Sequence, residues 1–254
     1  MAGRSPLCAA AGIATAMLAT LVLPVTAHAD DDGGPSARAL ADEARSNLLK
    51  AHSVHLKLTE RGRSVGRSTP ASMELALDRA GNCAGKLVMG DGGGSVELIK
   101  RGDQVWMKPD SAFWKAQLPG GQGAAIADRL RNRYLHGSTK EMVLRGMAHT
   151  CDLAAFQKEA GADSAHGIRL TKGGETKVDG TKVIPLTGTE HGRKKVLYVT
   201  SAAPHRLVKA TERRAGGDQS LTFTGYDEPV PSATPSATES VDISRLRQEL
   251  TGEP

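Results

Sequence analysis

The sequence predicts an α+β fold in which a strongly curved antiparallel β-sheet, a half-barrel of about ten or eleven strands, is covered by helices. Two long stretches alternate apolar and polar residues with the period of two that is typical of antiparallel strands, and a helical stretch separates them. The strands follow one another too closely for the helical crossovers that parallel sheets need. Because a sheet of this size does not stay flat, we expect it to curve, with helices covering its apolar concave face.

The composition is that of a globular protein with an aliphatic core. Of the 254 residues, 39% are hydrophobic and 24% are charged, but only 3% are aromatic. Leu, Val, Ile, Met and Ala must therefore supply the core. The 29 Gly and 12 Pro residues suit many turns and exclude a long helical rod.

Residues 1–29 have the pattern of a secretory signal peptide. An apolar run from Leu7 to Val25 is followed by Ala27-His28-Ala29, which predicts cleavage after Ala29. An uncleaved membrane anchor is the alternative, since the run is just long enough to span a bilayer. Cys8 precedes the run instead of following it, so we expect no lipid anchor. The chain is thus expected to be secreted into the extracytoplasmic space, with residues 30–35 as a disordered leader.

An amphipathic helix is expected next, from Ser36 to about Ala51. Ser36 is a good N-cap residue, and apolar residues recur behind it at helical spacing. Five strands should follow, because apolar residues then alternate with polar ones between turns. The apolar positions are Val54, Leu56, Leu58, Met73, Leu75, Leu77, Leu87, Met89, Val96, Leu98, Val105 and Met107.

The middle of the chain is expected to be helical. Ile126, Leu130 and Tyr134 lie four residues apart, as on one face of a helix. Ser138 and Glu141 have the spacing of a capping box for the next helix. A last helix should run from about residue 150 to 160, with Gly161 ending it.

Six further strands are expected, near residues 166–172, 176–180, 182–188, 193–200, 205–213 and 219–226. One domain is therefore expected over residues 36–228. Residues 229–254 begin as a Pro/Ser/Thr-rich connector and continue as a C-terminal tail, in which residues 241–250 suit a short strand or one helical turn.

Two cysteines, Cys83 and Cys151, lie beyond the signal sequence. In an exported chain an even pair predicts one disulfide bond. The alternative is a reactive thiol at Cys151, near the start of a predicted helix. Neither a CxxC motif nor a Cys/His pair supports that alternative.

The motifs of catalysis, metal binding and phosphate binding are absent from the sequence. The Gly81–Lys86 segment is one residue too short for a P-loop, no HExxH or clustered ligand set is present, and no GxSxG marks a nucleophile. We expect no enzyme activity, no cofactor and no metal site, with a hydrolase of unrecognised type as the remaining enzymatic alternative.

Nucleic acid is an unsuitable partner despite the net charge of +5. The chain is expected to be exported, and its basic clusters lack interleaved aromatic residues. A basic surface near an anionic membrane or wall polymer is the better functional interpretation, and an ordinary solubilising surface is the alternative.

One face of the predicted first strands is rich in soft apolar side chains that suit a cavity for alkyl chains. A closed core is an equally good explanation of the same residues. The predicted cavity-lining residues are Leu56, Leu58, Met73, Leu75, Leu77, Met89 and Met107.

The order of these elements resembles the LolA/LolB/LppX-type superfamily of exported lipoprotein and lipid carriers. The resemblance covers roughly residues 36–250 and includes the segments Gly102–Lys108 with Phe113-Trp114, Asp179–Val183 leading to Val196–Val199, Pro204–Lys209, and Phe223–Asp227. It implies a half-open curved sheet whose mouth is plugged by helices, a hydrophobic cavity for acyl chains, and no catalysis. The sequence departs from many lipid-carrying relatives in having no lipobox, which favours a free carrier or sensor.

Composition, pattern and resemblance together predict an exported, non-enzymatic and monomeric binder of lipids or acylated ligands. The alternative is an envelope sensor or protein-interaction module with the same fold, a filled core and no lipid cargo. Its partner would be an envelope protein or a membrane surface.

Overall fold

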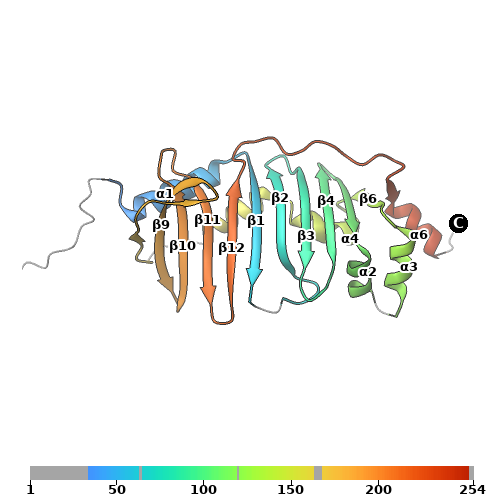
Figure 1. Ribbon diagram of the computed structural model, residues 1–254. Coiled ribbons are helices and arrows are strands. Elements are labelled where there is room, and N and C mark those ends of the chain that lie inside the picture. The colour runs from blue at the N-terminus through green and yellow to red at the C-terminus, as the bar shows by residue number, and fades with distance from the viewer. Residues whose placement is uncertain (1–33, 63–64, 119, 163–167, 252–254) are drawn as a thin grey trace, which may run out of the picture. The chain divides into compact units, whose positions relative to one another are not determined.

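The computed structural model describes residues 34–62, 65–118, 120–162 and 168–251 (Figure 1). The predicted signal peptide and residues 30–33 of the predicted leader lie outside this part of the chain. The first strands are β1 Ser53–Arg61, β2 Pro70–Asp78, β3 Cys83–Met89, β4 Ser95–Arg101, β5 Gln104–Pro109 and β6 Tyr134–Ser138. The later strands are β7 Thr171–Lys172, β8 Thr176–Val178, β9 Thr181–Glu190, β10 Arg193–Thr200, β11 Leu207–Arg214, β12 Gly217–Thr224 and β13 Ser240–Asp242. The helices are α1 Ala37–Lys50, α2 Ser111–Gln117, α3 Gln122–Arg129, α4 Met142–His149, α5 Leu153–Ala162 and α6 Ile243–Thr251.

All thirteen strands of the described residues belong to one curved, unclosed sheet, which confirms the predicted α+β class. The order is β13-β6-β5-β4-β3-β2-β1-β12-β11-β10-β9-β7, with β8 attached to β9. Every pair is antiparallel except β13 with β6. Strand β1, the first of the early strands, pairs with β12 of the later strands. The strands nearest the two ends of the predicted domain therefore lie side by side in the middle of the sheet.

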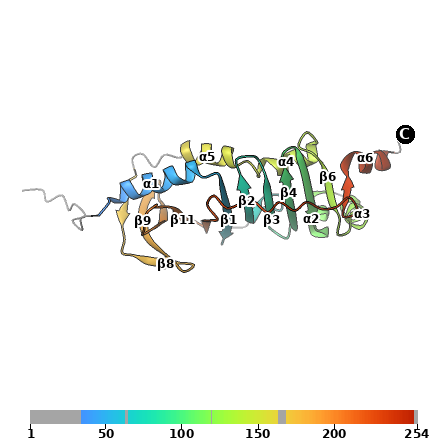
Figure 2. The same ribbon diagram turned by 90° about the horizontal axis from the view of Figure 1, so that it is seen from above.

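Helices α1, α5 and α4 lie along one face of the sheet, here called the inner face (Figure 2). Helix α1 packs on β10, β11 and α5, while α4 packs on β5 and β6. The opposite, outer face carries the β8–β9 hairpin, which projects from it (Figure 2). Over β1 and β9–β12, the described helices therefore cover only the inner face.

Helix α1 forms as predicted. The Ser36 hydroxyl accepts a hydrogen bond from the Ala39 backbone N–H at 3.2 Å and caps the helix. Its buried stripe is Ala37, Leu40, Ala41, Ala44 and Leu48. The small residues of this stripe allow the helix backbone to approach the sheet closely.

Two hairpins are closed by two-residue turns whose second residue is glycine. Asp179 and Gly180 join β8 to β9 with φ angles of 47° and 83°, and His191 and Gly192 join β9 to β10 with 48° and 75°. Positive φ at both central positions defines the type I′ turn, for which a glycine second residue is favoured.

The middle of the chain differs from the prediction. Helix α3 ends at Arg129, and Tyr134 begins strand β6 instead of extending a helix. Asn132 adopts φ of 58°, which breaks the helical path before Tyr134. The four-residue spacing of Ile126, Leu130 and Tyr134 was therefore a misleading signal.

Two predicted helix boundaries are also wrong. Ser138 is the last residue of β6, and α4 begins at Met142 with no side-chain cap from Glu141. Gly161 lies inside α5 and does not end it. The N-terminus of α5 is instead capped by Asp152, whose carboxylate accepts from the Ala155 N–H at 2.8 Å.

The C-terminal tail adds both a strand and a helix. β13 pairs with β6, and α6 follows it directly. Gly137 makes this packing possible, because a Cβ there would lie 2.7 Å from the Ile243 side chain and 3.0 Å from that of Leu144. With β6 and β13, the sheet has thirteen strands where about ten or eleven were predicted.

Candidate functional site

An apolar groove lies on the inner face, between the sheet and helices α1 and α5. Its floor is a row of side chains that the strand register places side by side across β2, β1, β12, β11 and β10. The row is Met73, Leu58, Leu221, Ala210 and Leu197. Leu207 and Phe223 extend the floor on neighbouring positions of β11 and β12.

The two helices form the walls of the groove. Ala41, Ala44 and Leu48 line it from α1, and Phe156 and Ala160 line it from α5. The Phe156 and Phe223 rings meet with centroids 6.2 Å apart. The volume of the groove is about 590 Å³, which lies within the range of about 300–1,000 Å³ that small-molecule sites occupy.

In the floor of the groove, several apolar side chains remain partly exposed to solvent. Leu58, Leu197 and Leu221 are half-buried, although each lies on the inner face. At β2–β5, by contrast, inner-face residues such as Leu75, Leu98 and Met107 are at most 1% exposed. The inner face therefore has a closed core over most of β2–β6 and an open apolar floor along the row from Met73 of β2 to Leu197 of β10.

The structure divides the seven predicted cavity residues between these two regions. Leu58 and Met73 lie in the floor of the groove. The others belong to the closed core and do not border the groove: Leu56, Leu75, Leu77, Met89 and Met107. They point to the same face as the floor residues, but helices and neighbouring side chains fill the space above them.

Most of the floor comes from residues outside the predicted cavity-lining set. Leu221 and Phe223 lie two residues apart in β12, and this alternation was a usable signal. Ala210 and the helix residue Ala41 gave no signal, because only the strand register and the position of α1 bring them to the groove.

Hydrogen bonds from buried and half-buried side chains hold the two wall helices together. The Gln157 amide of α5 donates to the Leu48 and Ala51 carbonyls at the end of α1, both at 2.9 Å. Arg45 of α1 donates to the Ala160 and Gly161 carbonyls of α5. These bonds fix the spacing of the walls.

One end of the groove is polar. Two residues beyond the apolar row, the register aligns Glu60 of β1, Gln219 of β12 and Glu212 of β11 on the same face. The Gln219 amide donates to Glu60 at 2.8 Å, and Arg214 donates to Gln219 and Glu212 at 2.8 and 2.7 Å. An amphipathic ligand would meet apolar contacts inside the groove and a hydrogen-bonding network at this end.

The predicted disulfide bond between Cys83 and Cys151 is present. It joins the start of β3 to the segment between α4 and α5, with the two Cα atoms 5.4 Å apart. The bond anchors the helices that cover the closed part of the inner face.

Within the described residues, no group of three His, Cys, Asp or Glu side chains is arranged to hold a metal ion. In the same part of the chain, no helix has the length and hydropathy required to cross a bilayer.

Comparison with known proteins finds solved structures of similar fold but no similar sequence. No protein-family model matches the chain, and no curated protein matches it significantly. Among solved structures, LprF from Mycobacterium bovis aligns with a TM-score of 0.54 and 14% identity over 81% of this chain and 100% of that one. The lipoprotein LppX from Mycobacterium tuberculosis aligns with a TM-score of 0.50 and 15% identity over 78% of this chain and 98% of that one.

The architecture thus defines a class, a single curved sheet with helices along its inner face and an apolar groove beneath them. The mycobacterial proteins LppX and LprF share this fold. The alignments cover nearly the whole of both mycobacterial proteins.

Proposed function

We propose that this protein is an exported, non-enzymatic and monomeric carrier that binds the alkyl chain of a lipid or acylated ligand in the groove. The observation that carries the proposal is the half-buried apolar row on an otherwise tightly packed inner face. Aliphatic side chains with few hydrogen-bonding groups suit an alkyl chain, and each methylene moved out of water contributes about 0.8 kcal/mol.

The polar end of the groove orients the ligand in this proposal. The alkyl chain lies along Leu58, Leu221 and Ala210, and the polar head lies at Gln219 and its charged neighbours. The shared fold with LppX and LprF supports a binding role, and the signal-like residues 1–29 support export with cleavage after Ala29.

A fluorescent long-chain fatty acid titrated into the full mature chain tests the proposal. Ala210 lies in the floor between Leu221 and Leu197, so Ala210→Trp places an indole in the groove. We expect this variant to bind the probe at least roughly tenfold more weakly, since several methylene contacts are lost. Leu221→Gln, which keeps the volume but adds an amide, is expected to weaken binding in the same direction.

Val88→Trp is the matched control, because Val88 is 41% exposed on the outer face of β3 and does not line the groove. It should bind the probe as the unmodified protein does. Absence of probe binding to the unmodified protein, or unchanged binding by a folded Ala210→Trp variant, would overturn the proposal.

A further inference from the structure

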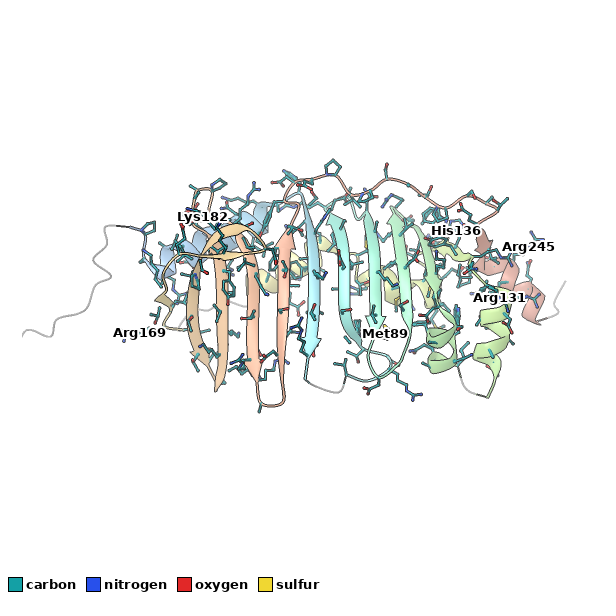
Figure 3. All side chains as sticks on the ribbon, in the orientation of Figure 1. Met89, Arg131, His136, Arg169, Lys182 and Arg245 are labelled. Carbon is teal, nitrogen blue, oxygen red and sulfur yellow. A yellow bond between two sulfur atoms is a disulfide. The ribbon has the colours of Figure 1, made fainter. Side chains whose placement is uncertain are left out.

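A second hollow lies on the outer face, behind the sheet from the groove. It occupies about 600 Å³ above β1, β12, β11 and β10. The β8–β9 hairpin stands over this face, and its tip residue Asp179 lines the hollow (Figures 1 and 2). Figure 3 labels Lys182 on this hairpin, where it pairs with Glu175 at 3.1 Å.

The strand register builds a regular grid of side chains in the hollow. Its central row consists of hydroxyl groups, because Thr59 of β1 pairs with Ser220 of β12, which pairs with Thr211 of β11. These three side chains point to the outer face, so none of them meets the apolar groove. The row therefore presents hydrogen-bond donors and acceptors on the outer face of the sheet.

A cationic row lies on each side of the hydroxyl row. On one side are Lys57 and Lys209, with the ring of Tyr198 next to Lys209. On the other side are Arg61, Arg213 and Lys194, with Asp218 between the two arginines. Residues on one face of a strand repeat every ~7 Å, so the two cationic rows are ~14 Å apart.

Five cations and three carboxylates line the hollow, so its positive charge is only partly neutralised; the carboxylates are Asp179, Glu212 and Asp218. Arg213 pairs with Asp218 at 3.2 Å, and Lys57 pairs with Glu74 at 3.1 Å. Among the residues that the structure describes, no carboxylate lies within ion-pair distance of Arg61, Lys194 or Lys209. Three cations beside a row of hydroxyls are therefore available to a ligand.

We propose that the outer hollow binds a hydroxylated polyanion, namely a sugar or polyol polymer that carries phosphate groups. Repeating phosphates match the two spaced cationic rows, and the polymer hydroxyls match Thr59, Ser220 and Thr211. Tyr198 supplies an aromatic ring in the hollow that a sugar or the carbon backbone of a polyol can contact. Because the β8–β9 hairpin projects from the outer face, a linear chain suits the hollow better than a flat bilayer does.

The test is a titration of the full mature chain with soluble poly(glycerol phosphate) at low and high salt. We expect binding that weakens as salt is added, because the contacts are largely exposed charge pairs. Lys194→Gln combined with Lys209→Gln should weaken binding roughly tenfold, since two charge contacts are lost. The double variant Lys50→Gln with Lys140→Gln removes the same charge from exposed sites outside the hollow and should bind as the unmodified protein does.

Neutral dextran and duplex DNA complete the experiment. The proposal requires that dextran does not bind and that DNA binds more weakly than the polyol phosphate, because DNA leaves the hydroxyl row unused. Failure of poly(glycerol phosphate) to bind at low salt, equal binding of DNA, or unchanged binding by the Lys194/Lys209 variant would each overturn it. Binding to anionic vesicles without binding to the soluble polymer would also overturn it.

Discussion

Gln157 shows how one side chain sets the geometry of the groove. Its side chain is only 6% exposed, and its amide N–H groups satisfy two carbonyls at the C-terminal end of α1. The last carbonyls of a helix have no partners within the helix. A buried amide from α5 therefore stabilises the end of α1 and fixes the distance between the walls.

Replacing Gln157 with Leu should destabilise the protein by about 1–3 kcal/mol, the usual cost of leaving buried polar groups without partners. The measurement is urea unfolding followed by circular dichroism. Gln122→Leu, at an exposed position of α3, is the matched control and should change the free energy of unfolding little. Equal effects of the two substitutions would contradict the role assigned to Gln157.

A second residue-scale feature is an ionic cluster on β4, β5 and β6. Glu97 accepts hydrogen bonds from Lys108 at 2.9 Å and from the Tyr134 hydroxyl at 2.8 Å. Partial burial alone would raise the pKa of Glu97, but these hydrogen bonds and the Lys108 charge outweigh it, so the pKa lies below its ordinary value of 4.5. Burial and the hydrogen bond to Glu97 raise the pKa of Tyr134.

The lowered pKa of Glu97 gives a defined pH dependence. Its carboxylate stabilises the folded state fully above pH 4.5, and this contribution is lost as the pH falls through the lower folded-state pKa. The unmodified protein should be more stable than Glu97→Gln near neutral pH, and the difference should vanish in acid. Urea unfolding across this pH range checks the expectation, and a difference that stays constant into strong acid would contradict it.

At the scale of elements, the disulfide links parts of the chain that pack in different layers. Cys83 and Cys151 are both 0% exposed and are 68 residues apart in sequence. Their bond ties β3 to the segment that leads into α5, and α5 is one wall of the groove. We therefore expect the bond to stabilise the helical cover of the sheet.

The Cys83→Ala/Cys151→Ala variant should lose roughly 4 kcal/mol of unfolding free energy, as the chain-entropy model gives for a loop of this length. Denaturant unfolding of the oxidised protein and of the variant measures the loss. Ala is preferred to Ser because both positions are buried and a hydroxyl would lack a partner. Identical unfolding midpoints would contradict a structural role for the bond.

Sequence patterns predicted the elements whose local signals agree with their packing. Helix α1 has a Ser36 cap and one continuous buried stripe. In β1, apolar and polar residues alternate, as expected for a strand with one face toward the core and one toward solvent. Strand β6 was missed because Tyr134 continues a helical spacing, and only Asn132 and the packing at Gly137 decide against a helix. The spacing of apolar residues reveals neither a residue with left-handed backbone angles nor a tertiary contact, so it could not show that the helix ends before Tyr134.

The groove was predicted only in part, for a related reason. Alternation assigns Leu58 and Leu75 to the same face, but it does not say which of them a helix covers. That depends on the position of α1 and α5 and on the pairing of β1 with β12, whose residues Leu58 and Leu221 are far apart in sequence. Which residues line the groove depends on the pairing of strands that are distant in sequence, and this pairing cannot be read from a single sequence.

At the scale of the whole described unit, one sheet presents two different chemical surfaces. On the inner face, β1, β12, β11 and β10 supply the apolar floor of the groove. On the outer face, the alternate residues of the same strands supply cations and hydroxyls. The period of two in a β-strand makes this separation possible without any additional domain.

The central claim is that the groove holds an alkyl chain, and native mass spectrometry tests it most directly. The full mature protein, purified from its own host without a delipidation step, should carry additional mass that organic solvent extracts as lipid. Ala210→Trp, prepared identically, should carry much less of this mass. Lipid-free unmodified protein, or an equal lipid load on both proteins, would contradict the account.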